Sequence, residues 1–269
     1  MGGIRCFRGI TRLAADLVED SQLVKPTVSV AGRPQPAAWG KDQLSAHLQD
    51  AHQNRLATFA NKPEDFVRLQ AIDGCFATIT RSWFNPRPVI SALLLIRAHG
   101  AFRSACEVTI AGQTVETFIM IRALLESVGY AAHISLHPRL SEVWLRRHDN
   151  SAAKRAAKAE FTITKIRQSI STRDRHAAER FQRLYDDSID FGGHPNERAI
   201  TSNLVKNERN GAEQLEQVLL HGDGPALDHA FISVARAGLL ALDILQIPFS
   251  ARFELLGVRE RMLGLRTGL

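Results

Sequence analysis

Apolar residues recur at intervals of three and four along most of the chain, which is the spacing of one buried face of an α-helix. The prolines of the segment NPRP, residues 85–88, end one such pattern, because proline removes a backbone donor and clashes with the preceding turn. No alternation of strands and helices is visible, so the sequence predicts an all-α multi-helix bundle rather than a Rossmann fold or a TIM barrel. The clearest helical stripe consists of Phe66, Leu69, Ile72, Phe76, Ile79 and Trp83.

Other stretches predict helices in the same way. Residues 89–135 are dense in apolar side chains, and the segment AGQT at 111–114 predicts a turn that makes them a helical hairpin, although one kinked helix also fits. Residues 225–246 and 250–265 predict two further helices, the first opened by a proline at a favoured position. Residues 151–170 predict one continuous helix with a narrow apolar stripe, formed by Ala152, Ala156, Ala159, Ile163, Ile166 and Ile170.

Two segments depart from the helical pattern. Residues 200–221 are the least helical stretch and predict either a small β-hairpin around NERNGA or a loop with a short helix, with the hairpin favoured. Residues 1–41 are rich in Pro, Gly and small residues towards their end, which predicts a loosely ordered arm or linker. Asp42 is a suitable N-cap for the helix that follows. The sequence therefore predicts a single helical domain over residues 42–269 behind an N-terminal arm.

Composition adds an expected compartment. Hydrophobic residues make up 45% of the chain and charged residues 23%, which is ordinary for a soluble globular protein. Cys6, Cys75 and Cys106 form neither a disulfide framework nor a zinc pattern, so we expect a reducing, cytoplasmic location. No uncharged apolar run reaches the length of about 18 residues that a transmembrane helix needs, so we expect no membrane partner. Common catalytic and phosphate-binding motifs are absent, and we expect neither a metal nor a cofactor.

The most informative polar pattern lies inside an apolar helix. Arg122, Glu126, Tyr130 and His133 fall on one face of a helix that is otherwise apolar. Such residues must pair with one another, meet other polar groups or line a wet pocket, so the sequence predicts either a buried ion-pair network or a pocket wall. Gly129, within the same face, favours a pocket, because a glycine inside a helix is unfavourable unless something needs the space.

Neighbouring segments extend this hypothesis. We expect the preceding helix to bring Arg103 opposite Glu126 and Glu107 opposite Arg122. Trp144 and Arg147 follow soon after and could reach the same region, with a stacking face and a guanidinium fork for an anion. The loop DFGGHPNER at 190–198 adds two polar side chains that could close the site. The predicted ligand-binding residues are therefore Arg122, Glu126, Tyr130, Trp144, Arg147, His194 and Asn196.

A catalytic role for this site stays open at the sequence level. If the site is catalytic, Glu126 or His194 is the candidate general base and Arg122 the candidate anion stabiliser. A metal held by Asp187, Asp190 and His194 matches no strong ligand signature. The first functional hypothesis is therefore a pocket for a small ligand with an anionic or hydrogen-bonding head, with or without catalysis.

Charge suggests a second hypothesis. The chain carries a net charge of +6, and residues 139–183 hold twelve Lys or Arg against five Asp or Glu. Lys154, Lys158 and Lys165 lie opposite the apolar stripe of the predicted helix 151–170, so this segment is a candidate nucleic-acid-binding surface. The third hypothesis is a structural or dimerisation module without catalysis, in which the alanine-isoleucine stripe lies at a helix–helix interface or at the interface of a homodimer.

A family resemblance bears on the second hypothesis. The stretch GQTVETFIMIRALLESVGYAAHI, the Trp-containing helix after it and the later HPNER resemble a group of uncharacterised bacterial helical proteins with a HEPN-like look. Members of the HEPN-like superfamily include RNase toxins and defence proteins. HEPN ribonucleases typically carry an Arg, four to six further residues and then a His, and no Arg here has a His at that spacing. The resemblance therefore implies a helical fold without implying ribonuclease activity.

Overall fold

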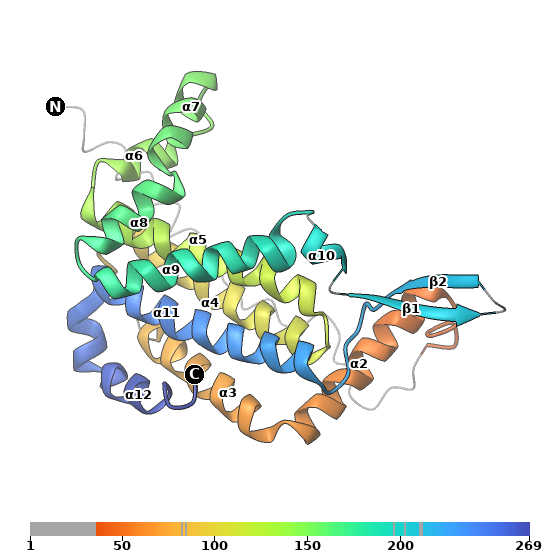
Figure 1. Ribbon diagram of the computed structural model, residues 1–269. Coiled ribbons are helices and arrows are strands. Elements are labelled where there is room, and N and C mark those ends of the chain that lie inside the picture. Colours follow the sequence, from red (N-terminus) through yellow and green to blue (C-terminus); the bar gives the residue numbers. More distant parts are fainter. Residues whose placement is uncertain (1–35, 82, 84, 196, 202, 210–211) are drawn as a thin grey trace. The chain divides into compact units, whose positions relative to one another are not determined.

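The computed structural model describes residues 36–81, 83, 85–195, 197–201, 203–209 and 212–269 (Figure 1). The chain divides into two compact units, residues 1–46 and 47–269, and each is described by itself. In the first unit the backbone N–H of Ser45 donates to Asp42 Oδ1 at 2.9 Å, so Asp42 caps helix α2 (Gln43–Asn61) as predicted. Residues 1–35, most of the predicted arm, lie outside the described part of the chain.

Four long helices form the core of the second unit. These are α3 (Pro63–Thr80), α4 (Val89–Ile110), α5 (Thr114–Leu136) and α11 (Pro225–Leu255). Helix α11 packs against the other three, and α4 packs along α5 as an antiparallel neighbour (Figure 1). The stripe predicted on α3 faces this core, with Leu69, Ile72, Phe76 and Ile79 buried and the two flanking aromatic residues half-buried. An all-α multi-helix bundle is therefore confirmed.

The hairpin between α4 and α5 turns at the predicted place. Gly112 has a φ of +81°, a conformation that favours glycine. Its carbonyl accepts from the backbone N–H of His221 at 2.8 Å, and a Cβ on Gly112 would lie only 2.1 Å from the His221 carbonyl oxygen. Two features therefore require glycine at position 112: its positive φ, and the close approach of the backbone at His221, in the segment that leads from the hairpin to the last long helix.

The outer layer differs from the prediction at one point. This layer consists of α6 (Leu140–Leu145), α7 (Ser151–Glu160), α8 (Ile163–Ser171) and α9 (Arg175–Ser188). The sequence predicted one continuous helix over 151–170, where the structure has the two separate helices α7 and α8. Thr162 begins α8 as its N-cap, with its hydroxyl accepting from the Lys165 N–H at 3.4 Å, and Phe161 before it packs against the core. The break rotates the first half of the predicted stripe out of the core: Ala152, Ala156 and Ala159 are exposed, while Ile166 and Ile170 are buried.

The segment after α9 contains the only β-structure among the described residues. A π-helical turn, η1 (Ile189–Gly193), and a short α10 (Glu197–Thr201) lead to β1 (Leu204–Arg209) and β2 (Ala212–Gln217). The strands pair antiparallel, with Leu204 opposite Gln217 and Arg209 opposite Ala212. This confirms the small hairpin that the sequence favoured at 200–221.

The C-terminal part is one kinked helix followed by a short one. Helix α11 passes through Pro248, and Phe249 has the non-helical angles φ −132° and ψ 27°. Gly257, at φ +62°, separates it from α12 (Val258–Gly264). The kink at Phe249 separates the two helices that the sequence predicted over 225–246 and 250–265, and Gly257 adds a second break within the latter.

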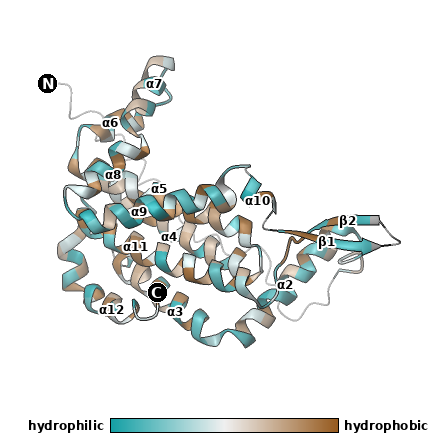
Figure 2. Ribbon diagram, in the orientation of Figure 1, coloured by the Kyte–Doolittle hydropathy of each residue, from teal (hydrophilic) through white to brown (hydrophobic). Residues whose placement is uncertain are grey.

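Three of the core helices have a second property. By length and composition alone, α4, α5 and α11 are apolar enough to cross a membrane, with buried shares of 56%, 50% and 72% for their most apolar windows. The sequence criterion missed them because it required an uncharged run, and each of these helices carries charged residues. In Figure 2 hydrophilic and hydrophobic residues alternate along the outer helix α9, as expected of a helix with one buried and one exposed face.

Candidate functional site

The predicted polar face of α5 is present, and its middle part holds a half-exposed ion pair. Arg122 Nε donates to Glu126 Oε1 at 2.9 Å, and the Tyr185 hydroxyl on α9 donates to the same oxygen at 3.2 Å. The Arg122 guanidinium also lies 5.3 Å from the centre of the Tyr185 ring. The two charged side chains are 26% and 42% exposed, so they form a half-exposed ion pair on the surface between α5 and α9.

The predicted partners of this pair from α4 are wrong. Arg103 Nε donates to Asp73 Oδ1 on α3 at 2.7 Å, and the His99 ring contacts the same oxygen at 2.6 Å. Glu107 pairs with Arg55 on α2 at 3.3 Å. The polar row of α4 therefore faces α3 and α2, and α4 packs on α5 through its apolar side.

Tyr130, another predicted residue, lies within electrostatic reach of Glu126 and of Arg147. Tyr130 is half-buried and packs on Phe161, with ring centres 4.8 Å apart. Burial raises the pKa of Tyr130, the Glu126 carboxylate raises it further and the Arg147 guanidinium opposes them, so both charges act on the phenol. Trp144 is half-buried against the core, and the buried Arg147 Nε has no hydrogen-bond partner in the described part of the chain.

Gly129 does not open a pocket. A Cβ at this position would lie 2.7 Å from Ile166 Cγ2 and 3.2 Å from Phe181 Cζ. The glycine is therefore needed for the close approach of α8 and α9 to α5, which is a packing reason and not a ligand.

The loop after α9 lies beside another part of α5. Phe191 in η1 packs on Phe118 with ring centres 5.1 Å apart, and a Cβ on Gly192 would meet the Val115 carbonyl oxygen at 2.3 Å. His194 is exposed at the end of η1, and its role in closing the Arg122–Tyr130 region stays a prediction. Asn196 lies outside the described residues. Asp190 pairs with Arg198 at 3.1 Å.

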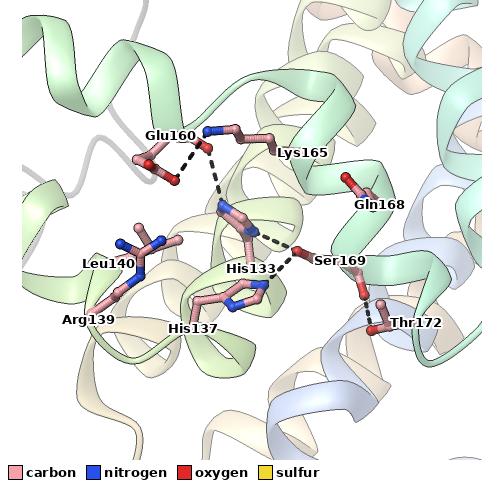
Figure 3. Close-up of a pocket in the computed structure, with 9 residues that line it drawn as sticks. All are labelled: His133, His137, Arg139, Leu140, Glu160, Lys165, Gln168, Ser169 and Thr172. Atoms are coloured by element: carbon pink, nitrogen blue, oxygen red, sulfur yellow. Dashed lines mark hydrogen bonds and ion pairs between the residues drawn. The ribbon is translucent and has the colours of Figure 1, made fainter.

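A polar cavity lies further along the same face of α5, near its C-terminal end (Figure 3). Its volume is about 350 Å³, and α5, α8 and the segments next to them provide its walls. Phe161 stands between this cavity and Tyr130, with its ring 5.5 Å from that of His133. The lining residues are His133, His137, Arg139, Leu140, Glu160, Lys165, Gln168, Ser169 and Thr172.

A chain of three hydrogen bonds forms one wall of the cavity. His133 Nε2 lies 3.2 Å from the Glu160 carbonyl oxygen, His133 Nδ1 lies 2.7 Å from Ser169 Oγ, and His137 Nε2 lies 3.2 Å from that same Oγ (Figure 3). A carbonyl can only accept, so the proton of a neutral His133 sits on Nε2 and Nδ1 accepts from the Ser169 hydroxyl. The hydroxyl has a single proton, so His137 donates to Ser169 Oγ. The contacts thus assign every proton in the chain.

Burial sets the charge state of this chain. His133 and Ser169 are each only 4% exposed. Burial lowers the pKa of His133, while its hydrogen bond to the Glu160 carbonyl acts in the opposite direction. The His133 imidazole is therefore neutral at pH 7, which agrees with the proton positions above.

Part of the cavity wall is basic. Arg139 and Lys165 both line it, and the Glu160 carboxylate is the one acidic side chain among the described lining residues. Lys165 Nζ lies 3.3 Å from Glu160 Oε2. The hydroxyl of Thr172 and the amide of Gln168 complete the polar lining. Such a wall can neutralise and hydrogen-bond a small anion, and the histidine chain can exchange a proton with it.

A second cavity lies at the kink of α11 and has a different character. Its volume is about 400 Å³, and Trp83, Phe249 and two leucines form much of its lining. Arg252 there donates to the carbonyl oxygens of Ile79 and Arg81. Because its walls are largely apolar and its best-placed donor already serves the backbone, we take the histidine cavity as the candidate site.

The sequence identified only part of this site. From the sequence, His133 was recognised as a member of the polar face of α5. His137, four residues later, could have indicated the site, because residues four apart share a helix face. Ser169 and Lys165 were missed as partners because a single helix over 151–170 placed α8 incorrectly. No group of three or more His, Cys, Asp or Glu in the described ranges could hold a metal ion.

Comparisons with known proteins add no relative. No family model, curated protein or solved structure matches this chain. The HEPN-like resemblance of the sequence therefore stays a prediction, and function is argued from the cavity itself.

Proposed function

We propose that the protein binds a small anionic ligand, carrying a carboxylate or phosphate group, in the cavity between α5 and α8. One observation carries the proposal: Arg139, Lys165 and His137 line one cavity, in which the His133–Ser169 hydrogen bond orders two further polar side chains. This keeps the small-ligand function that the sequence suggested and moves its site about two helical turns along α5.

Size and charge support a small ligand. A volume of about 350 Å³ lies at the lower end of the range for small-molecule pockets, roughly 300–1,000 Å³. Two permanent positive charges face one carboxylate, so an added monoanion balances the lining. A cytoplasmic location and a homodimer belong to the same proposal as expectations of the sequence.

Calorimetric titration with three matched probes tests the proposal. Phenyl phosphate and benzoate carry the anion on the same ring, and benzyl alcohol is their neutral counterpart. We expect the two anions to bind and the alcohol not to. Arg139→Ala and Lys165→Ala should each weaken anion binding by about tenfold or more, as expected for hydrogen bonds to a charged group. Lys154→Ala, on the exposed face of α7, is the control and should leave binding unchanged.

A variant that is expected to bind the anion more tightly provides the stricter test. Glu160→Gln removes the acidic lining side chain and releases Lys165 from its 3.3 Å ion pair, while leaving the backbone carbonyl that orients His133. Benzoate should then bind more tightly than to the wild-type protein. Equal binding of the alcohol and the anions, or weaker binding by the Gln variant, would overturn the proposal.

A further inference from the structure

We infer that Ser169 is a nucleophile with His133 as its general base, and that the cavity hydrolyses small carboxylic esters that carry an anionic group. The inference rests on the proposed function, because the same basic side chains would hold the substrate. It adds a reaction to what is otherwise a binding site.

The geometry is that of an activated hydroxyl. Ser169 Oγ lies 2.7 Å from His133 Nδ1, within the range of about 2.6–3.2 Å for a nucleophile and its base. The base is oriented in turn by a third group, since His133 Nε2 donates to the Glu160 carbonyl. This reproduces the logic of a catalytic triad with a backbone carbonyl in place of the usual carboxylate.

The Ser169 hydroxyl contacts His133 and not the backbone carbonyl that a helical serine usually contacts. Serines and threonines inside helices usually donate to the carbonyl one turn earlier, as Thr109 does to Ala105 and Ser127 to Ala123, both at 2.7 Å. Ser169, inside α8, instead directs its oxygen at two imidazoles on α5. Ser169 and His133 both line the cavity in which we place the ester.

The protonation state is the one the reaction needs. Burial lowers the pKa of His133, and the charges of His137, at the end of the same helix, and of Lys165 on the facing helix α8 act in the same direction. The Glu160 carbonyl and carboxylate act against them. The ring is therefore the free base at neutral pH and can take a proton.

The reaction balances without any further reagent. Ser169 Oγ bonds to the ester carbonyl carbon while its proton passes to His133 Nδ1, and the developing oxyanion faces the basic wall. The carbon–oxygen bond to the alcohol then breaks, and His133 returns the proton to the leaving alcohol. Water repeats the sequence on the acyl-serine, so one ester and one water give one carboxylic acid and one alcohol.

Covalent labelling of the native protein tests the inference without relying on a variant. We expect diisopropyl fluorophosphate to form one adduct, which peptide mass spectrometry places on Ser169, and 4-nitrophenyl acetate to give a burst of nitrophenolate. Protein that is denatured by heat before the reagent is added should form no adduct. The labelling rate should fall as the pH is lowered through the pKa of His133, because the protonated ring cannot act as base.

Two variants separate the roles. His133→Gln keeps a donor for the Glu160 carbonyl and removes the base, so labelling of Ser169 should slow by about 100-fold or more. Ser171→Ala replaces an exposed serine of the same helix and should change nothing. Ser169→Ala removes the nucleophile and should abolish the burst.

The outcomes distinguish this inference from the proposed function. An unlabelled Ser169 in the folded wild-type protein overturns the nucleophile, even if benzoate binds. Labelling that is unchanged in His133→Gln overturns the base. Failure of benzoate to bind or to slow labelling contradicts the anion site while leaving the nucleophile standing.

Discussion

At the scale of single residues, the atoms around a helical glycine decide whether its replacement by alanine stabilises or destabilises the fold. Gly129 faces Ile166 and Phe181, whereas a Cβ on Gly100, in the middle of α4, would meet no neighbouring atom within 4 Å. Gly129→Ala should therefore lower the free energy of unfolding by about 1–3 kcal/mol through overpacking. Gly100→Ala should raise it by roughly 0.5–1 kcal/mol through helix propensity. Urea denaturation of both variants checks the prediction, and equal effects of the two changes would contradict it.

Single residues also mark the limit of what the sequence could predict about the site. A polar face on α5 could be predicted from Arg122 to His133 because helical periodicity fixes which residues share a face. The partners of that face could not, since they come from other helices whose rotation the pattern leaves open. Both sides of α4 are apolar enough to pack, and for that reason Arg103 and Glu107 were assigned to the wrong neighbour.

At the scale of elements, the break between α7 and α8 changes the two alternative hypotheses. Thr162 was the available signal, because threonine is a good N-cap, but the run of well-spaced apolar residues outweighed it. Ile166 and Ile170 are buried within the chain itself, so the stripe proposed for a homodimer does not present them to a partner. The homodimer stays a prediction and now lacks the surface on which it was argued.

The same break separates the three lysine residues that were predicted to bind nucleic acid. Lys154 and Lys158 are exposed on α7, while Lys165 lines the cavity on α8. We expect any oligonucleotide binding to fall with salt and to depend on α7. Lys154→Ala with Lys158→Ala should reduce the slope of log affinity against log salt by about 2, roughly 1 for each lost phosphate contact. Fluorescence anisotropy across a salt series measures this, and an equal loss in Lys165→Ala would show that the two functions share one surface.

At the scale of the whole molecule, buried histidines couple stability to pH. Burial lowers the pKa values of His99, His133 and His221 below the usual 6.5, with the hydrogen bond to Asp73 opposing this at His99. Between the folded and unfolded pKa values the unfolded chain binds more protons, so folding is favoured at higher pH. The free energy of unfolding should therefore fall as pH drops below about 6.5.

One histidine's share of this effect can be isolated. His133→Gln should show a smaller fall in the free energy of unfolding between pH 7 and pH 5 than the wild-type protein, whatever its stability at pH 7. His176→Gln, which replaces a 90% exposed side chain on α9, is the matched control and should keep the wild-type slope. Chemical denaturation at several pH values gives both slopes, and a steeper fall in His133→Gln would contradict the assignment of a neutral buried ring.

The fold as a whole could be predicted further than the site. Periodicity, the glycine turn at Gly112 and the NERNGA segment were enough for an all-α bundle with one hairpin, because these signals are local. The cavity depends on the angle at which α8 meets α5 after the break at Thr162, which no local pattern contains. The three long apolar helices illustrate the same limit, since their composition alone does not say whether protein or lipid surrounds them.

The most direct test of the anion site is nitrogen-15 NMR of the histidine rings, recorded as phenyl phosphate is added at neutral pH. The hydrogen-bond chain predicts a neutral His133 with its proton on Nε2, and the proposed site predicts that the ring signals of His137 shift on titration while those of His176 do not. A His133 proton on Nδ1, or His137 signals that ignore the anion, would contradict the account.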